Sequence, residues 1–219
     1  MKNYKKNLDL LTKNHVYSKE MEHDACGVGL IASTEGKKSR AVVEYGIEAL
    51  KAVWHRGAVD ADGKTGDGAG IHVEIPKDFF IEKIEVTGHD YDNSEICVGM
   101  IFLPKNDYAS QESCKTIVES ELTKNNFSIY GWRQVPVNPK VLGEKALQTM
   151  PEIIQVLFKS NDPNLLDKSL ERKIYETRKI IENKAFDASL NNFYICSISS
   201  KSIIYKGLYL AEAISDFYL

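Results

Sequence analysis

A thiol opens an apolar, glycine-punctuated run at Cys26-Gly27-Val28-Gly29-Leu30-Ile31-Ala32. A short apolar run of this kind is typical of a buried strand, so we expect a strand over residues 26–33. Residues 1–25 ahead of it are polar and rich in lysine. Two interpretations stay open for them: a flexible N-terminal tail, or a leader removed by cleavage between Ala25 and Cys26.

Cleavage at that bond would give Cys26 both a thiol and a free α-amine. An α-amine has an ordinary pKa of about 7.7–8.0 and a thiol one of about 8.5. The amine can therefore act as a general base near neutral pH, while the thiolate is the stronger nucleophile. This is the arrangement of an N-terminal nucleophile. Alone the signal is weak, because an internal cysteine beside glycines is more often a small buried apolar residue.

Composition narrows the class of protein. The chain has 219 residues, of which 43% are hydrophobic and 27% charged, as in an ordinary globular domain with its own core. A net charge of −3 argues against nucleic acid as a partner. No apolar run approaches the roughly 18 residues that span a membrane, and residues 1–25 lack the roughly 7–15 apolar residues of a secretory signal. The four cysteines have no Cys-x-x-Cys spacing, so we expect reduced thiols in a cytoplasmic protein.

The hydrophobic periodicity predicts alternating helices and strands beyond residue 33. Ser39 is a candidate N-cap for a helix that ends at Gly57. His55 and Arg56 then lie at its C-terminal end, where the helix dipole favours cations. Further helices are expected from Asp107 to about Asn125, over 142–149, from 165 to about 183, and from 210 onward. Strands are expected over 71–75, 96–103, 127–135, 153–158, 192–198 and 202–205, the last two forming a hairpin. This number of strands favours antiparallel sheets with helices outside them.

A glycine-rich loop spans residues 63–70, and three interpretations of it are possible. A phosphate-binding loop needs a Gly-Lys-Ser/Thr sequence or a helix after the glycines, whereas here a strand follows. A calcium-binding EF-hand loop that began at Asp60 would need glycine and glutamate where Thr65 and Ile71 stand. Close backbone packing beside an active site is the interpretation that the glycine content favours.

Several blocks after Cys26 carry a resemblance to a known family. They are His55-Arg56-Gly57-Ala58, Ala61-Asp62, Thr65-Gly66-Asp67-Gly68-Ala69-Gly70-Ile71, Gly131-Trp132-Arg133-Gln134-Val135-Pro136, Leu142-Gly143-Glu144-Lys145-Ala146, Glu171-Arg172-Lys173-Ile174-Tyr175, Phe193-Tyr194-Ile195-Cys196-Ser197 and Tyr205-Lys206-Gly207. Together with Cys26-Gly27 they resemble the glutaminase domain of glutamate synthase large subunits, which are class II glutamine amidotransferases. The resemblance covers nearly all of residues 26–219. It implies a leader over residues 1–25 and an amidotransferase domain from residue 26.

The resemblance also implies a fold and a site. The fold is an α+β, four-layer αββα sandwich of the N-terminal-nucleophile hydrolase type, incomplete at its C-terminus. Cys26 is the catalytic residue. Arg56, followed by Gly57, supports the active site because the matching arginine of the family lies close to the nucleophile. The substrate is L-glutamine. The block around Trp132 and Arg133 marks the family without implying a chemical role.

The sequence departs from the family in two places. Class II amidotransferases use an Asn-Gly pair as oxyanion hole and an arginine of an Arg-Phe/Tyr-Ser-Thr block to bind the substrate carboxylate. Neither an Asn-Gly pair nor an Arg-Phe-Ser or Arg-Tyr-Ser block occurs in these 219 residues. In the family both lie downstream, as do the segments for FMN and an iron–sulfur cluster, which use a reduced electron donor.

We therefore expect an N-terminal part of a larger enzyme, with synthase domains as its partners, and no cofactor or metal in this segment. Alternatives are a truncated, inactive interaction module and a different cysteine N-terminal-nucleophile amidase.

Overall fold

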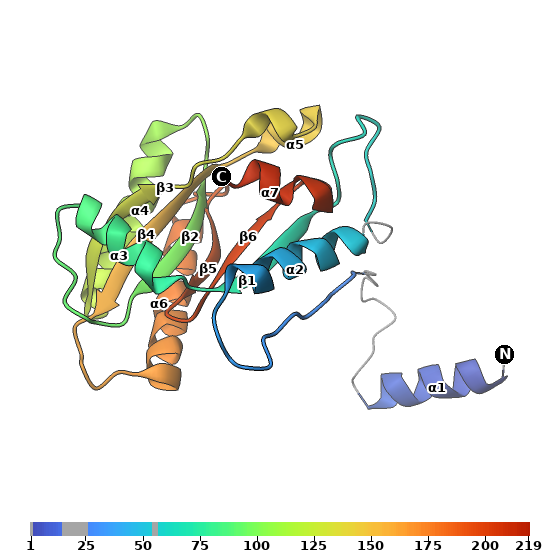
Figure 1. The fold of residues 1–219 in the computed structure, drawn as a ribbon, viewed down its shortest axis with the longest axis horizontal. Coiled ribbons are helices and arrows are strands. Elements are labelled where there is room, and N and C mark those ends of the chain that lie inside the picture. The colour runs from blue at the N-terminus through green and yellow to red at the C-terminus, as the bar shows by residue number, and fades with distance from the viewer. Residues whose placement is uncertain (1, 15–25, 54–56) are drawn as a thin grey trace.

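The computed structural model describes residues 2–14, 26–53 and 57–219 (Figure 1). The helices are α1 Lys2–Lys13, α2 Arg40–Ala52, α3 Lys77–Val86, α4 Tyr108–Lys124, α5 Glu144–Thr149, α6 Asp167–Asp187 and α7 Ile214–Phe217. Short 3-10 helices cover Pro139–Val141 and Ala211–Ala213. The strands are β1 Ala69–Glu74, β2 Cys97–Leu103, β3 Phe127–Gln134, β4 Glu152–Ser160, β5 Tyr194–Ser199 and β6 Ser202–Gly207. No helix within the described ranges is both long and apolar enough to span a membrane.

The strands form two antiparallel sheets. One has four strands in the order β3-β4-β2-β5, and the other pairs β1 with β6. In the central strand pair Met100 lies opposite Gln155, and in the smaller sheet Ile71 lies opposite Tyr205. The predicted α+β class with antiparallel sheets is therefore confirmed.

Two apolar clusters hold the layers together, one on each face of the four-stranded sheet. The first includes Cys97, Ile101 and Phe158 of the sheet, packed with Leu122 of α4 and Ile174 of α6. The second lies on the opposite face, where the small sheet, α3 and the C-terminal helices meet the large one; it includes Val98, Met100, Leu157, Ile203, Phe80 and Phe217. Helix α2 lies against β1 (Figure 1). Burial of this apolar surface is the main stabilising contribution to the fold.

Local signals in the sequence set several elements. Helix α2 begins after Ser39, as predicted. Helix α4 begins after Asp107, whose side chain accepts a hydrogen bond from the Ser110 amide at 3.0 Å, as an N-cap residue should. Along β1 the half-buried and exposed residues alternate, which confirms the period of two seen in the sequence.

The predicted hairpin over residues 192–205 is wrong. Both strands exist, but β5 pairs with β2 in the large sheet and β6 pairs with β1 in the small one. The chain crosses between the sheets at Ser200 and Lys201. Glu171 of α6 fixes this corner, because its carboxylate accepts hydrogen bonds from the Ser199 hydroxyl and from the amide and hydroxyl of Ser200 at 2.7–2.9 Å. The short connection between β5 and β6 thus joins two different sheets rather than two neighbouring strands of one sheet.

The predicted buried strand over residues 26–33 is also wrong in this structure. These residues form no strand, and the side chains of Val28 and Leu30 are 91% and 89% exposed. A strand needs a neighbour for its backbone N–H and C=O groups. None of the strands in the described part of the chain pairs with this segment.

Two further differences lie at the ends of the chain. Residues 2–13, part of the segment interpreted as a flexible tail or a removable leader, form helix α1. Of the helix expected from residue 210 onward, only the short helix α7 and the 3-10 turn before it form.

Candidate active site

Cys26 is an exposed, free thiol at the head of the segment that contains Val28 and Leu30. A side chain added at Gly29 would meet no atom within 4 Å. The segment turns at its end, where the Gly36 amide donates to the Ser33 carbonyl at 3.2 Å. The candidate nucleophile is therefore open to solvent.

Arg56, the residue expected to support Cys26, lies outside the described residues, as does His55. Helix α2 ends at Ala52 rather than at Gly57. Gly57 itself is exposed at the start of the following loop. The predicted roles of Arg56 and Gly57 beside the nucleophile thus stay predictions.

The loop after Gly57 is ordered by its own hydrogen bonds. Val59 and Gly66 form an antiparallel bridge, and the Asp60 amide donates to the Thr65 carbonyl at 2.9 Å. Asp62 accepts from the amides of Lys64 and Thr65 at 2.9 and 2.7 Å, and from the Thr65 hydroxyl at 2.6 Å. These donors, the Thr65 hydroxyl first, hold the pKa of Asp62 well below its usual range. The Asp-x-x-Thr spacing of Asp62 and Thr65 is the local sequence signal for this turn.

Glycines bring this loop against two other parts of the chain. A Cβ at Gly143, the N-cap of α5, would lie 2.2 Å from Asp62 Oδ2 and 2.3 Å from Thr65 Oγ1. A Cβ at Gly66 would lie 2.8 Å from the carbonyl oxygen of Tyr209. Lys145 of α5 adds an ion pair with Asp60 at 2.7 Å. The close backbone packing predicted for the glycine-rich loop is therefore confirmed, while its place beside an active site is untested.

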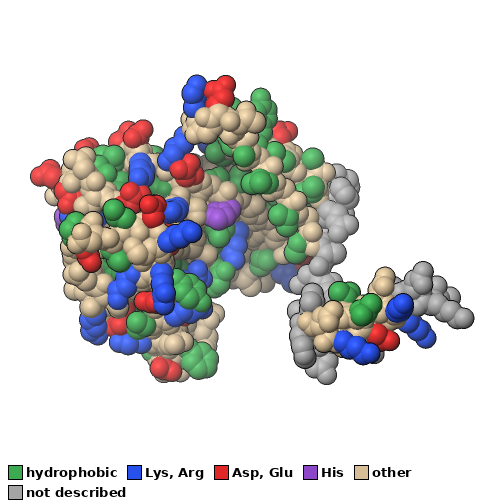
Figure 2. Space-filling model, turned by 90° about the horizontal axis from the view of Figure 1, so that it is seen from below, with side chains coloured by type: hydrophobic (Ala, Val, Ile, Leu, Met, Phe, Trp, Pro, Cys, Tyr) green, Lys and Arg blue, Asp and Glu red, His purple; other side chains and the backbone are tan. Residues whose placement is uncertain are grey.

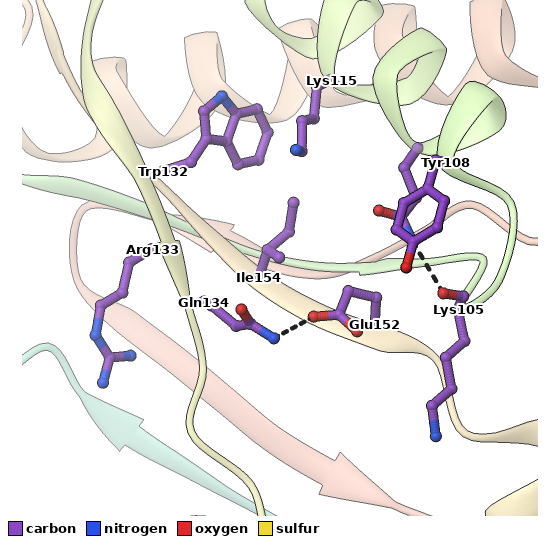
Figure 3. Close-up of a pocket in the computed structure, with 9 residues that line it drawn as sticks. Lys105, Tyr108, Lys115, Trp132, Arg133, Gln134, Glu152 and Ile154 are labelled. Carbon is purple, nitrogen blue, oxygen red and sulfur yellow. Dashed lines mark hydrogen bonds between the residues drawn. The ribbon is translucent and has the colours of Figure 1, made fainter.

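A surface pocket of about 420 Å³ lies between α4 and the ends of β3 and β4 (Figure 3). It is lined by Lys105, Tyr108, Gln111, Lys115, Trp132, Arg133, Gln134, Glu152 and Ile154. The Trp132 indole donates to Glu119 at 2.6 Å, and Gln134 donates to Glu152. The charged side chains that line the pocket are of both signs. Acidic and basic side chains are likewise mixed over the face of the molecule drawn in Figure 2. Cys26, the candidate nucleophile, is not among the residues that line the pocket.

The remaining cysteines are buried free thiols. Burial raises the pKa of Cys114 and of Cys196 to about 11 in each case, and raises that of Cys97 further. Across the described ranges, no three His, Cys, Asp or Glu side chains come together in a way that could hold a metal ion. Cys26 is thus the one cysteine whose thiol is open to a substrate.

The sequence profile of the class II glutamine amidotransferases matches residues 26–219, so the chain belongs to this family. Its match begins at Cys26.

The chain is similar to the glutamate synthase [NADPH] large chain of Azospirillum brasilense, with 51% identity over 215 residues, which are 98% of this chain and 14% of that protein. It is also similar to ferredoxin-dependent glutamate synthase 1 of Arabidopsis thaliana, with 40% identity over 90% of this chain and 12% of the relative. Ferredoxin-dependent glutamate synthase 2 of Synechocystis is 37% identical over the same shares. The chain therefore spans about one seventh or less of the length of these relatives.

Proposed function

We propose that this chain is the glutaminase part of a glutamate synthase, which releases ammonia from L-glutamine for the synthesis of glutamate from 2-oxoglutarate. One observation carries the proposal: the family match begins at Cys26, which is an exposed thiol at the head of an apolar run. The proposal includes removal of residues 1–25, because an N-terminal nucleophile needs a free α-amine.

The chemistry follows from the two groups of a processed Cys26. Its thiolate attacks the side-chain amide carbon of glutamine, and the carbon–nitrogen bond breaks to leave a thioester. The α-amine carries the thiol proton to the departing nitrogen, which leaves as ammonia. Water then attacks the thioester, releases glutamate and restores the thiol. The sum is one glutamine and one water converted to one glutamate and one ammonia.

The oxyanion of the tetrahedral intermediate needs fixed donors, each worth about 10²–10³ in rate. The Asn-Gly pair that supplies them in the family is absent from these 219 residues. We therefore propose that the 219-residue chain alone has little glutaminase activity, and that segments of a longer polypeptide supply the donors and the arginine for the substrate carboxylate.

We further propose that the same segments complete the four-layer αββα sandwich. The small sheet has two strands in the described structure, and the apolar side chains of Val28 and Leu30 are exposed. Pairing of residues 26–33 in this sheet would satisfy their backbone groups and bury both side chains. The same step would fix Cys26 in place beside Arg56.

The companion domains, rather than this segment, would hold FMN and an iron–sulfur cluster. A cluster needs several cysteine thiolates together, whereas Cys97, Cys114 and Cys196 are buried thiols with raised pKa values that form no such group. The residues described do not fit a cluster, and the mechanism above uses none. Reduced thiols are also the reason to propose a cytoplasmic location.

The intact mass of the polypeptide isolated from its native host tests the proposal first. We expect a species that begins at Cys26 and is far heavier than this chain. That species should hydrolyse glutamine, Cys26→Ala should abolish the hydrolysis, and Cys114→Ala, a change at a buried thiol, should leave most of it. A polypeptide that starts at Met1 and ends at Leu219 would refute the proposal, as would full activity of the Cys26→Ala variant.

A further inference from the structure

Arg133 of β3 lies at the edge of the surface pocket, and its side chain points to the opposite side of the strand from that of Trp132 (Figure 3). Its guanidinium lies over the Phe79 ring, with 5.1 Å between its central carbon and the ring centroid. Its Nη1 donates to Gln155 Oε1 of β4 at 2.8 Å. The two residues are directly opposite each other in the strand register. Stacking and hydrogen bonding therefore hold the guanidinium in one orientation.

The positive charge of Arg133 has no acidic partner among the described residues, since none of their ion pairs includes it. Burial lowers the pKa of this guanidinium, which means that the cation is partly removed from water. A partly buried charge without a counter-ion is unfavourable. An arginine fork also has five N–H donors, and the bond to Gln155 uses one.

The surroundings of Arg133 have an excess of hydrogen-bond donors. Gln155 is 0% exposed, and its Nε2 has no hydrogen-bond partner within the described structure. Tyr205 of β6 lies beside both residues: burial raises the pKa of its phenol by more than the neighbouring Gln155 and Arg133 lower it, so it stays a neutral hydroxyl. Cation, amide and hydroxyl thus gather where β3 and β4 meet the small sheet. What the cluster lacks is an acceptor with negative charge.

We propose that Arg133 binds a carboxylate at this boundary between the two sheets, with Gln155 as the residue that positions the guanidinium. A carboxylate matches the planar fork of arginine with two acceptor oxygens and balances its charge. It can come from an Asp or Glu side chain of a polypeptide segment outside these residues, or from a small free dicarboxylate. The inference does not depend on glutamine hydrolysis.

Thermal unfolding of the 219-residue chain tests the free-ligand source, with glutarate as probe and its neutral diamide as control. Glutarate at about ten times its dissociation constant should raise the Tm by about 3–6 °C, and the diamide should not. Arg133→Met should abolish the shift, and Arg133→Lys, which keeps the charge without the fork, should reduce it. Arg172→Met, at an exposed arginine paired with Glu176, is the matched control and should keep the shift. An equal shift in the Arg133→Met variant would overturn the proposal.

Comparison with the longer polypeptide from the native host tests the side-chain source. If an acidic side chain occupies the site, glutarate will leave the Tm of that polypeptide unchanged, and Arg133→Met will lower its Tm more than that of the 219-residue chain. If the Arg133→Met variant does not fold, the same comparison is made with Arg133→Lys. If glutarate has no effect on the short chain and Arg133→Met lowers both Tm values equally, Arg133 is only a structural partner of Gln155, and the proposal is wrong.

Discussion

Gly143→Ala should destabilise the protein through the loop that follows Gly57. The added Cβ would lie 2.2 Å from Asp62 Oδ2, 2.3 Å from Thr65 Oγ1 and 2.6 Å from the Thr65 amide nitrogen. All these separations are shorter than any van der Waals contact, and all three atoms take part in the hydrogen bonds within the Asp62–Thr65 turn. Either α5 or the turn must therefore move.

The loss of stability can be estimated from the contacts that Gly143→Ala disturbs. Overpacking of this kind costs about 1–3 kcal/mol. Each hydrogen bond lost if Thr65 shifts adds roughly 1 kcal/mol. We expect the free energy of unfolding to fall by about 2–4 kcal/mol, which lowers the Tm by roughly 4–16 °C in a chain of this size.

Thermal and urea unfolding followed by circular dichroism measure this change. Gly29→Ala is the matched control, because its Cβ would meet nothing within 4 Å, and it should stay within about 0.5 kcal/mol of the parent. Adding Thr65→Ala to Gly143→Ala removes one clashing oxygen, so the double variant should lose less stability than the two single changes together. A Gly143→Ala protein as stable as the Gly29→Ala control, or strictly additive effects, would refute the reasoning.

Two further predictions concern exposed and buried polar groups. A thiol reagent added to the native chain should modify Cys26 rapidly and the other three cysteines only after unfolding in urea, because those three are buried; two or more fast thiols in the native chain would contradict this. Glu121 of α4 is 4% exposed and accepts from Lys184 and Lys124 at 2.6 and 3.0 Å, and these lysines, Lys184 first, lower its pKa. Its ion pairs should thus stabilise the fold fully above its ordinary pKa of about 4.3 and lose effect as the pH falls through the lowered value. Glu121→Gln should cost about 1–3 kcal/mol at pH 7 and weaken the acid-side decline of stability, whereas Glu112→Gln, at a 72% exposed side chain, should change stability by less than about 0.5 kcal/mol. Equal effects of the two changes would argue against a role for the buried pairs.

Much of the secondary structure could be predicted because its signals are local. The cap at Asp107, the alternation along β1 and the helical stripe with Leu170, Ile174 and Ile181 all depend on residues within a few positions of one another. Such signals report the period of the backbone and the groups that satisfy its ends. Helix α3 was not predicted, because its apolar residues Phe79, Phe80 and Ile81 are consecutive and give no clear helical period.

The candidate site could be predicted only in part. The thiol at Cys26 and the family blocks are visible in the chain itself, and so is the absence of an Asn-Gly pair. The partners of Arg133 could not be predicted, because it stacks on Phe79 and binds Gln155, which are 54 and 22 positions away in the sequence. No local pattern specifies such contacts.

The sequence by itself determined the class of the protein and most helices and strands, and it marks Cys26 as the candidate nucleophile, since each rests on residue chemistry or on short-range periodicity. The tertiary structure alone decided the sheet to which each strand belongs. β5 and β6 are joined by a short turn but lie in different sheets, because their backbone groups pair with β2 and β1. The apolar run at residues 26–33 forms no strand here for the same reason: backbone pairing requires a neighbour, and distant parts of the chain must supply it.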